Sequence, residues 1–547
     1  MSLAEEKYSN LNQVLDEKAE KIPEHIFVKY EDRTLSYKEF HENVLRLANV
    51  YQSLGAKKGD FIGIQMTNSI EFCLGVYACY RIGAVATPLI SLWKLKEVKE
   101  AVKKAKIKLM LVKSTIGSVA KKMCSKDDMN VIIIGDGSDY EDLPGYKGEF
   151  WKLIKDADAT DPGIEVNIED LASCHFTSGT TGKSKGVLHD HKGYLFAGRV
   201  HTATFKLDEN EYSNLVLPMY HIFGFTQLHA MVYVGGTIRM LDKFDPQVLL
   251  KALEDQEMTV FCGVPSIYKM LLAQDNIEDF DISHKNKLFI SGAGPLPPVT
   301  EAGLNDRLLK GKGITCQAYG GTEDICVGTA NFDKVYGSIG KPMVGAKIEL
   351  VDSEGNILPP GEENVGELVN QGPHIMMGYL GDPAADDIID HDLTDPVLKP
   401  IKGKEGIWYW SGDVGYKDEK GFIYLTDRSK DIAKVSERLV YPSEVEATLI
   451  EHPELDEIAV IGVPHKIYGE QLLAIIVPVK SVRDYTDDDL KRIEEELRDM
   501  GLKELAKYKV PRHWWFKNQL QTNSLGKVLK KKYREKFTKL YEKGKIE

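Results

Sequence analysis

The sequence predicts an α/β protein whose largest part is built from two helix-flanked parallel sheets. Three observations indicate this class. Helical and strand patterns alternate over residues 1–340, short strands separated by turn residues follow from Gly345, and further helix and strand patterns come after Asp427. The chain has 547 residues, which is enough for two or more domains.

The first part of the chain supplies the two sheets. Apolar residues at helical spacing predict a helix over 39–54. The apolar run 72–90 is interrupted by Arg81, Gly83 and Pro88, so it is interpreted as a buried helix followed by a strand and not as a membrane span. Short apolar runs predict strands at 61–66, 109–112, 131–134, 213–217, 259–264 and 287–291.

The second part of the chain predicts a small antiparallel subdomain. A strand is predicted at 347–351, and a hairpin at 408–416 and 422–425. The charged stretch 428–431 lies between two packed regions, which predicts a hinge. We expect an N-terminal domain of residues 1–427, with its subdomain at about 345–427, a hinge at 428–430 and a C-terminal domain of residues 431–547.

Composition and charge narrow the function class. The hydrophobic fraction of 43% and the charged fraction of 28% are typical of soluble globular proteins. The formal net charge of −13 argues against binding nucleic acid through its phosphates. The seven cysteines form no C-x-x-C pair and the first residues lack a signal-peptide pattern, so we expect a cytoplasmic protein.

Residues 501–547 differ in charge from the rest of the chain. They hold 14 lysines and arginines against four glutamates. Such a segment is either a solvated helix face or a phosphate-attracting surface on a mobile lid, and the sequence leaves both interpretations open.

A glycine-rich loop at 177–186, TSGTTGKSKG, follows the apolar run 174–176. Its glycines let the backbone approach a polyphosphate, and its hydroxyl and ammonium groups add donors. A Walker A loop needs glycine five residues before Gly182, where this chain has Thr177. The spacing therefore argues against a P-loop NTPase.

A second cluster, QAYGGTED at 317–324, combines glycines with an acidic side chain. The glycines let the chain turn sharply, and Glu323 offers the hard oxygen ligand that Mg²⁺ prefers beside phosphates. The small residues of 291–295 follow a predicted strand and leave room for a flat adenine ring.

Two further clusters lie toward the C-terminus. Asp413 can accept both hydroxyls of a ribose, and Arg428, at the far end of the same hairpin, can bind hydroxyls or phosphate. Lys527 ends the short motif NSLGK at 523–527. Taken singly, such charged residues are usually on the surface.

Four motifs stand in the order and approximate spacing found in the adenylate-forming superfamily: TSGTTGKSKG, YGGTED, YWSGDVGYKDEKGFIYLTDRSKD and NSLGK. The chain resembles this superfamily over essentially its whole length and is most similar to AMP-forming medium- and long-chain fatty acid–CoA ligases. Aryl-CoA synthetases, luciferases and peptide-synthetase adenylation domains are other members. The resemblance implies a β-barrel subdomain and a small α+β C-terminal domain that rotates between half-reactions.

The resemblance assigns roles to individual residues. Thr322 is expected near the α-phosphate, Glu323 beside Mg²⁺, and Lys527 at the substrate carboxylate and α-phosphate; with His221 they form the expected catalytic set. Lys430 is the expected hinge residue. The expected ATP-binding residues are Thr177, Ser178, Gly179, Thr180, Thr181, Gly182, Lys183, Lys185, Ala293, Gly294, Tyr319, Gly320, Thr322, Asp413, Arg428 and Lys527.

The segment 218–225 resembles the family's aromatic segment beside the carboxylate site. Phe223 and Phe225 fit either this pocket or the core, and the sequence leaves both open. Acetate-type synthetases carry a tryptophan where this chain has Gly320, so the pocket favours a medium or long aliphatic chain or an aryl acid. The expected acyl pocket consists of Tyr220, His221, Phe223, Gly320 and Gly321.

One position departs from the family pattern. Glu437 stands where acyl-CoA synthetases usually have glycine. By resemblance, Ser436, Glu437 and Arg438 line the CoA tunnel, where Glu437 adds bulk and negative charge and Arg438 offers a partner for a CoA phosphate.

The expected function is that of an AMP-forming acid–CoA ligase of fatty acid metabolism that uses ATP, Mg²⁺ and coenzyme A. A carboxylate and ATP give acyl-AMP and pyrophosphate, and the CoA thiol then displaces AMP. The alternatives are an aryl-acid–CoA ligase, an acyl-adenylating enzyme with a non-CoA acceptor, and a non-catalytic nucleotide-binding regulator. We expect a monomer or homodimer that binds these small molecules, with no nucleic acid and no transmembrane segment.

Overall fold

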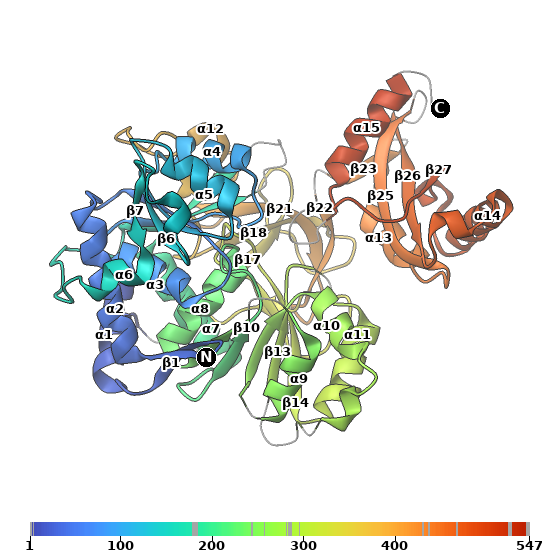
Figure 1. Ribbon diagram of the computed structural model, residues 1–547. Helices are drawn as coiled ribbons and strands as arrows, with labels where there is room; N and C mark the ends of the chain where they lie inside the picture. Colours follow the sequence, from blue (N-terminus) through green and yellow to red (C-terminus); the bar gives the residue numbers. More distant parts are fainter. Residues whose placement is uncertain are drawn as a thin grey trace. The chain divides into compact units, whose positions relative to one another are not determined.

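The computed structural model divides into two compact units (Figure 1). Unit 1 comprises Met1–Ile348 and Asn370–Tyr409, and unit 2 comprises Glu349–Val369 and Trp410–Glu547. The structure describes residues 3, 5–177, 184–241, 244–255, 257–280, 282, 287–294, 296–428, 431–435, 438–465, 469–522 and 528–542.

A nine-stranded sheet forms one half of unit 1. Its central strands, from β14 to β1, are parallel, and strands at both edges are antiparallel. In spatial order it contains β16 (Lys341–Pro342), β15 (Thr329–Asn331), β14 (Gly313–Tyr319), β13 (Lys287–Ser291), β12 (Val260–Gly263), β10 (Tyr212–Leu215), β11 (Thr237–Met240), β1 (Ile26–Tyr30) and β2 (Arg33–Ser36).

An eight-stranded sheet forms the other half. Strands β8, β4, β3, β5, β6 and β7 are parallel to their neighbours, whereas β9 is antiparallel to both β8 and β19. In spatial order it contains β19 (Gly378–Tyr379), β9 (Lys185–Asp190), β8 (Leu171–Thr177), β4 (Val85–Pro88), β3 (Phe61–Gln65), β5 (Leu109–Lys113), β6 (Asn130–Ile134) and β7 (Tyr146–Glu149).

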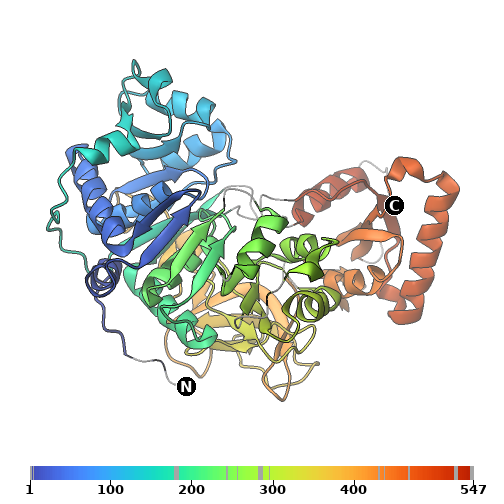
Figure 2. The ribbon, with the colours of Figure 1, turned by 60° about the horizontal axis from the view of Figure 1, so that its bottom comes forward.

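Helices cover both faces of each sheet, and successive side chains of a strand pack against helices on opposite faces. Ile62 and Ile64 of β3 pack into the central core with α2, α3, α7 and α8, whereas Phe61 packs with α4 and α5 on the opposite face. Figure 2 shows the blue and teal helices on the two faces of this sheet. On the other sheet, Cys262 faces the central core, and Phe261 packs against α9 and α10.

Side chains cap α1, α2, α3, α7, α9 and α12 of unit 1. Ser36, for example, caps α2 in a capping box with Glu39. The helices are α1 (Leu11–Lys21), α2 (Tyr37–Ser53), α3 (Ile70–Arg81), α4 (Leu95–Lys104), α5 (Gly117–Cys124), α6 (Phe150–Lys155), α7 (His191–Phe205), α8 (Ile222–Val234), α9 (Pro246–Glu254), α10 (Pro265–Leu272), α11 (Pro298–Gly303) and α12 (His391–Thr394).

A smaller sheet follows, where short strands were predicted. It has the order β17 (Lys347–Val351), β18 (Gly366–Gln371), β21 (Trp408–Lys417) and β20 (Leu398–Lys399), and β22 (Ile423–Arg428) also pairs with β21. The predicted hairpin is thus β21–β22, with the turn closed by a hydrogen bond from the Gly421 N–H to the Asp418 carbonyl at 2.9 Å.

The C-terminal part of unit 2 is one sheet between helices (Figure 1). Val460 and Ala474 face α13 and α14, whereas the neighbouring Ile461 and Leu473 face α15. The elements are β23 (Ala433–Val435), β24 (Arg438–Val440), α13 (Pro442–Leu449), β25 (Leu455–His465), β26 (Gly469–Pro478), α14 (Asp487–Glu504), β27 (His513–Phe516) and α15 (Lys530–Glu542).

The predicted α/β class with two helix-flanked parallel sheets is confirmed. The apolar run 72–90 forms most of α3 and strand β4, as predicted. Within the described ranges, no helix is long and apolar enough to cross a membrane.

Candidate active site

The glycine-rich motif connects two adjacent antiparallel strands. β8 and β9 pair along their length, up to Thr177 opposite Lys185, so the loop between them is a hairpin connection. The predicted phosphate-binding residues Ser178, Gly179, Thr180, Thr181, Gly182 and Lys183 lie outside the described residues. Thr177 and Lys185 therefore mark where the loop leaves and rejoins the sheet.

Tyr379 brings two predicted site residues together. The Lys185 Nζ lies 4.2 Å from the centroid of the Tyr379 ring. The Tyr379 hydroxyl donates a hydrogen bond to Glu323 Oε1 at 3.0 Å. Burial, followed by the negative charge of Glu323, raises the pKa of Tyr379 well above its usual value, so the hydroxyl stays protonated.

The backbone of the 321–326 loop is fixed by buried partners. The His189 Nε2–H donates to the Thr322 carbonyl at 2.7 Å, and the Met376 N–H donates to the Glu323 carbonyl at 2.8 Å. Burial lowers the pKa of His189 to about 4, which keeps the imidazole neutral. The carboxylate of Asp324, itself buried, accepts the Gly321 N–H at 2.6 Å. These contacts orient the Glu323 side chain.

Gly320 serves packing rather than the expected sharp turn. The left-handed residues are Ile325 and Cys326, with φ of 49° and 55°, and neither Gly320 nor Gly321 has a positive φ. A Cβ on Gly320 would lie 2.6 Å from the Cys326 Cα, closer than any side chain can approach. Gly320 is required because the loop folds back onto it.

The predicted adenine-site residues follow two neighbouring strands. Because β13 and β14 are parallel and Ser291 lies opposite Gln317, the segments 292–294 and 320–323 leave the same edge of the sheet. Ala293 has a φ of 64°, so the predicted small-residue turn contains a left-handed residue. Tyr319 ends β14. The carboxyl ends of parallel strands are where α/β sheets bind ligands.

The aromatic segment 218–225 divides between pocket and core. Phe225 is fully buried, with its ring centroid 4.6 Å from that of His175, so it belongs to the core. Phe223 is half-buried, and a Cβ on Gly292 would meet its ring at 2.8 Å. Phe223 therefore lies against the turn that precedes Ala293.

His221 stands at the N-terminus of α8, with its ring centroid 4.7 Å from that of Tyr220. Burial lowers the pKa of His221 to about 4. Its Nε2 is buried and has no hydrogen-bond partner in the described part of the chain. This neutral imidazole nitrogen is suited to a hydrogen bond with a bound molecule.

Unit 2 carries the remaining predicted residues. Asp413, 9% exposed on β21, lies opposite Arg428 on β22, and its N–H donates to Ser411 Oγ at 3.1 Å. The Arg438 guanidinium lies 4.9 Å from the Tyr508 ring centroid. The side chain of Arg428 and the residues Lys430, Ser436, Glu437 and Lys527 lie outside the described residues.

The donor set around Glu323 fits magnesium held together with phosphates. Among the residues that the structure describes, no three His, Cys, Asp or Glu side chains form a metal-binding group. Mg²⁺ is usually held by one or two carboxylates with phosphate oxygens and water, and does not need an all-protein cage. Glu323 is a single carboxylate of this kind, and it shares its contact with Tyr379 with the ammonium group of Lys185.

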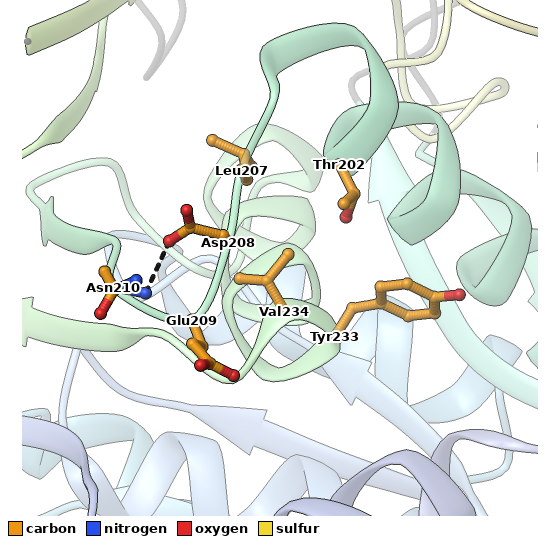
Figure 3. A pocket seen from close by; sticks show the side chains of 7 residues that line it. All are labelled: Thr202, Leu207, Asp208, Glu209, Asn210, Tyr233 and Val234. Atoms are coloured by element: carbon orange, nitrogen blue, oxygen red, sulfur yellow. Dashed lines mark hydrogen bonds between the residues drawn. The ribbon is translucent and has the colours of Figure 1, made fainter. Parts of the chain in front are cut away.

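A separate cavity of about 340 Å³ lies at the ends of α7 and α8 (Figure 3). Asp208 accepts a hydrogen bond from the Asn210 N–H at 2.8 Å within its own loop. None of the predicted site residues lines it, so it is distinct from the candidate active site. Its lining consists of Thr202, Leu207, Asp208, Glu209, Asn210, Tyr233 and Val234.

Sequence reasoning missed Tyr379 and His189. His189 lies four residues after Lys185 on the strand that follows the glycine-rich loop, so its inward-facing position could have been inferred from strand alternation. Tyr379 is 56 residues from Glu323, and no spacing in the sequence points to their contact.

The fold is that of an α/β protein, and comparison with known proteins identifies its class of enzyme. The chain belongs to the AMP-binding enzyme family, whose model matches residues 15–380, and the model of the AMP-binding enzyme C-terminal domain matches residues 444–527. This membership confirms the predicted superfamily and the predicted class of enzyme.

Three similar proteins illustrate the range of the family. The long-chain-fatty-acid–CoA ligase of Bacillus subtilis is 29% identical, covering 96% of this chain and 94% of its own. ATP-bound MatB from Rhodopseudomonas palustris has a TM-score of 0.83 and 26% identity, covering 97% of this chain and all of its own. The o-succinylbenzoate CoA synthetase MenE of Bacillus subtilis, in complex with ATP and a magnesium ion, has a TM-score of 0.78 and 25% identity, with 96% and 98% covered.

Proposed function

We propose that this protein is an ATP-dependent, AMP-forming acid–CoA ligase that uses Mg²⁺ and activates medium- or long-chain fatty acids. The observation that carries the proposal is the gathering of Lys185, Tyr379 and Glu323 beside the glycine-rich hairpin. An ammonium group and a carboxylate suited to Mg²⁺ are the groups that bind a polyphosphate. Membership of the AMP-binding enzyme family supports the same function.

The first half-reaction joins the acid to AMP. An oxygen of the substrate carboxylate attacks the α-phosphorus of ATP, the bond to the bridging oxygen breaks, and pyrophosphate leaves with that oxygen. Lys185 offsets phosphate charge, and the His189–Thr322 hydrogen bond fixes the backbone beside Glu323. Glu323 would hold Mg²⁺, which supplies charge neutralisation at the phosphates when bound.

The second half-reaction transfers the acyl group to CoA. The thiol sulfur attacks the acyl carbon, the bond from that carbon to the phosphate oxygen breaks, AMP leaves with the electron pair, and the thiol proton passes to solvent. By resemblance, residues 428–430 are the hinge of the C-terminal domain 431–547, Lys527 serves the first half-reaction, and Ser436, Glu437 and Arg438 serve the second.

The fatty acid assignment is supported by the shape of the loop beside β14. Gly320 has no room for a side chain, so a bulky cap on the acyl pocket cannot arise at this position. Phe223 offers an apolar surface, and each buried methylene of a chain contributes about 0.8 kcal/mol. The similar ligase of Bacillus subtilis is named for long-chain fatty acids.

An aryl acid is the second candidate, favoured by His221. Its buried Nε2 lacks a partner within the described residues, and a polar substituent on an aromatic acid would provide one, whereas an alkyl chain would not. MenE, named for o-succinylbenzoate, represents aryl acids among the similar structures.

The test is an acid panel scored in two assays. ATP–pyrophosphate exchange with Mg²⁺ measures adenylation, and CoA-dependent AMP release measures the complete reaction. We expect exchange and CoA-dependent AMP release with aliphatic acids of eight or more carbons. Exchange with aryl acids alone would replace the substrate assignment, and no exchange with any acid would overturn the enzyme assignment.

The acceptor is tested at Glu437. Exchange without CoA-dependent AMP release would indicate a non-CoA acceptor. If Glu437 obstructs the thiol tunnel, Glu437→Gly raises CoA thioester formation and leaves exchange unchanged, whereas Arg438→Ala weakens CoA binding if Arg438 holds a CoA phosphate. No change in thioester formation with either variant would remove these residues from the tunnel.

A further inference from the structure

We propose that Tyr379 is a positioning residue for nucleotide binding, with its hydroxyl acting on Glu323 and its ring acting on Lys185. The inference rests on the proposed function, in which Glu323 holds Mg²⁺ and Lys185 contacts the phosphates. A single side chain would then orient both the metal ligand and the cation of the site.

The hydroxyl restrains one oxygen of the carboxylate. Tyr379 Oη donates to Glu323 Oε1 at 3.0 Å. The other oxygen, Oε2, lies on the side of Gly321, where a Cβ would be 3.5 Å away. A neutral donor bound to a carboxylate forms a charge-assisted hydrogen bond, which fixes the carboxylate plane without cancelling its charge. Glu323 is therefore held in one orientation and remains able to bind a cation.

The ring restrains the ammonium group. Lys185 Nζ lies 4.2 Å from the ring centroid, within the range of a cation–π contact. A free lysine side chain has many rotamers, and ordering it costs free energy when a ligand binds. The contact with the ring restricts the Lys185 rotamers before a ligand binds, which lowers this cost. The ammonium hydrogens remain available to phosphate.

The backbone of Tyr379 is tied to the phosphate-loop hairpin. β19 pairs with β9, with Tyr379 opposite Val187, two residues after Lys185. The Tyr379 N–H donates to Thr394 Oγ1 at 2.9 Å, and its carbonyl accepts the Asp390 N–H at 2.8 Å. Both backbone groups of Tyr379 are engaged and the residue is 4% exposed, so the ring and hydroxyl are held at fixed positions relative to β9.

Two substitutions separate the two contacts. Tyr379→Phe removes the hydroxyl and keeps the ring, whereas Tyr379→Leu removes both. Metal affinity is measured by electron paramagnetic resonance titration of Mn²⁺ into protein with saturating ATP and no acid, so that no reaction occurs. ATP affinity without metal is measured by calorimetry in the presence of a chelator.

We expect Tyr379→Phe to weaken Mn²⁺ binding about tenfold and to change metal-free ATP affinity less than twofold. Tyr379→Leu is expected to weaken both, with the loss of ATP affinity about threefold. Lys185→Met should weaken metal-free ATP binding at least as much, and combining it with Tyr379→Leu should add nothing further. If the two substitutions instead reduced ATP affinity additively in the double variant, the ring would not act through Lys185.

Tyr268→Phe is the matched control. Tyr268 is fully buried in unit 1 and donates its hydroxyl to the Ile290 carbonyl at 2.8 Å, so its loss tests general destabilisation. Unchanged Mn²⁺ affinity in Tyr379→Phe, or an equal change in Tyr268→Phe, would overturn the role of the hydroxyl. Wild-type ATP affinity in Lys185→Met would overturn the role of the ring.

The outcome for the wild-type protein separates this inference from the proposed function. If the wild-type chain catalyses ATP–pyrophosphate exchange and the Tyr379 variants bind Mn²⁺ and ATP normally, only the inference fails. If the wild-type chain neither binds ATP with Mn²⁺ nor catalyses exchange, the proposed function fails and the inference falls with it.

Discussion

Units 1 and 2 differ in their buried histidines, although both carry ion pairs on their surfaces. Unit 1 contains six buried histidines between its sheets: His175, His189, His191, His201, His229 and His374. Unit 2 displays ion pairs on helix α14, where Arg492 contacts Glu454 at 2.7 Å and Glu496 at 2.9 Å. The difference follows from thickness, because unit 1 encloses an interior between two large sheets, whereas the C-terminal sheet of unit 2 is a single sheet with α13 and α14 on one face and α15 on the other.

One of the buried histidines of unit 1, His189, contacts the backbone of the candidate site. His189 supports the Thr322 carbonyl at 2.7 Å, and the His229 Nδ1–H donates to the Phe225 carbonyl at 2.7 Å. Neutral imidazoles are thus used as internal hydrogen-bonding groups. This comparison teaches that acid should act on unit 1, which contains Lys185, Glu323 and Tyr379, and that salt should act on the surface of unit 2.

Acidification is expected to have the largest effect. Burial lowers the pKa of His189, His201 and His229 to about 4 and that of His191 and His374 to about 3. The unfolded value is near 6.5, so the stability contributed by these neutral groups is complete above pH 6.5 and is lost as pH falls toward 4. At pH 5 the loss is about 2 kcal/mol for each histidine with a pKa near 4.

Hydrogen exchange at pH 7 and pH 5, corrected for the intrinsic rate, measures this effect. We expect amides of β8, β9 and α8 to lose protection at pH 5 while amides of β25 and β26 keep it. Asp190, whose pKa burial raises to about 6, acts in the opposite direction but is one group against several. Equal loss of protection in the two units would contradict the comparison.

The second prediction tests the role in adenylation that is proposed for Lys527. Lys527→Ala is expected to lower adenylation about a hundredfold, or about 3 kcal/mol, because a charge-assisted contact made in the transition state is lost. Thioester formation from supplied acyl-adenylate should be nearly unchanged. Single-turnover assays of each half-reaction measure the two rates.

Lys532→Ala is the control for this substitution, because Lys532 is an exposed lysine of α15 in the same unit. Its two half-reaction rates should match those of the wild type. Equal losses of rate in both half-reactions for Lys527→Ala would contradict the assignment of Lys527 to adenylation.

The third prediction tests the packing of the loop in unit 1. Gly320→Ala places a Cβ 2.6 Å from the Cys326 backbone and should lower the free energy of unfolding by about 2 kcal/mol. Gly321→Ala is the matched control, since its nearest contact is Glu323 Oε2 at 3.5 Å, an ordinary distance. Urea unfolding of both variants measures the difference, and similar losses would show that the 320 position is not constrained by this contact.

Much of this arrangement was predictable from local sequence patterns. Strand periodicity predicted β3, β5, β6 and β13 within a residue or so, because buried parallel strands are short apolar runs. The glycine-rich loop and Glu323 were found as motifs because their residue types carry the chemistry. The Tyr379 contacts were not predicted. They depend on the pairing of β19 with β9, two strands far apart in the sequence, and no local pattern indicates that pairing.

The smallest expected effect lies on the surface of unit 2. Arg492→Ala removes the contacts with Glu454 and Glu496, but Arg492 and Glu496 are both more than 40% exposed, so solvent screens the pair. The expected loss in the free energy of unfolding is therefore small. In 1 M salt the Debye length falls to about 3 Å, and the difference from the wild type should vanish, whereas the Gly320→Ala effect, which is steric, should persist. Urea unfolding at both ionic strengths measures the two effects, and a salt-independent loss for Arg492→Ala would mean that its side chain stabilises unit 2 by packing along α14 rather than by charge.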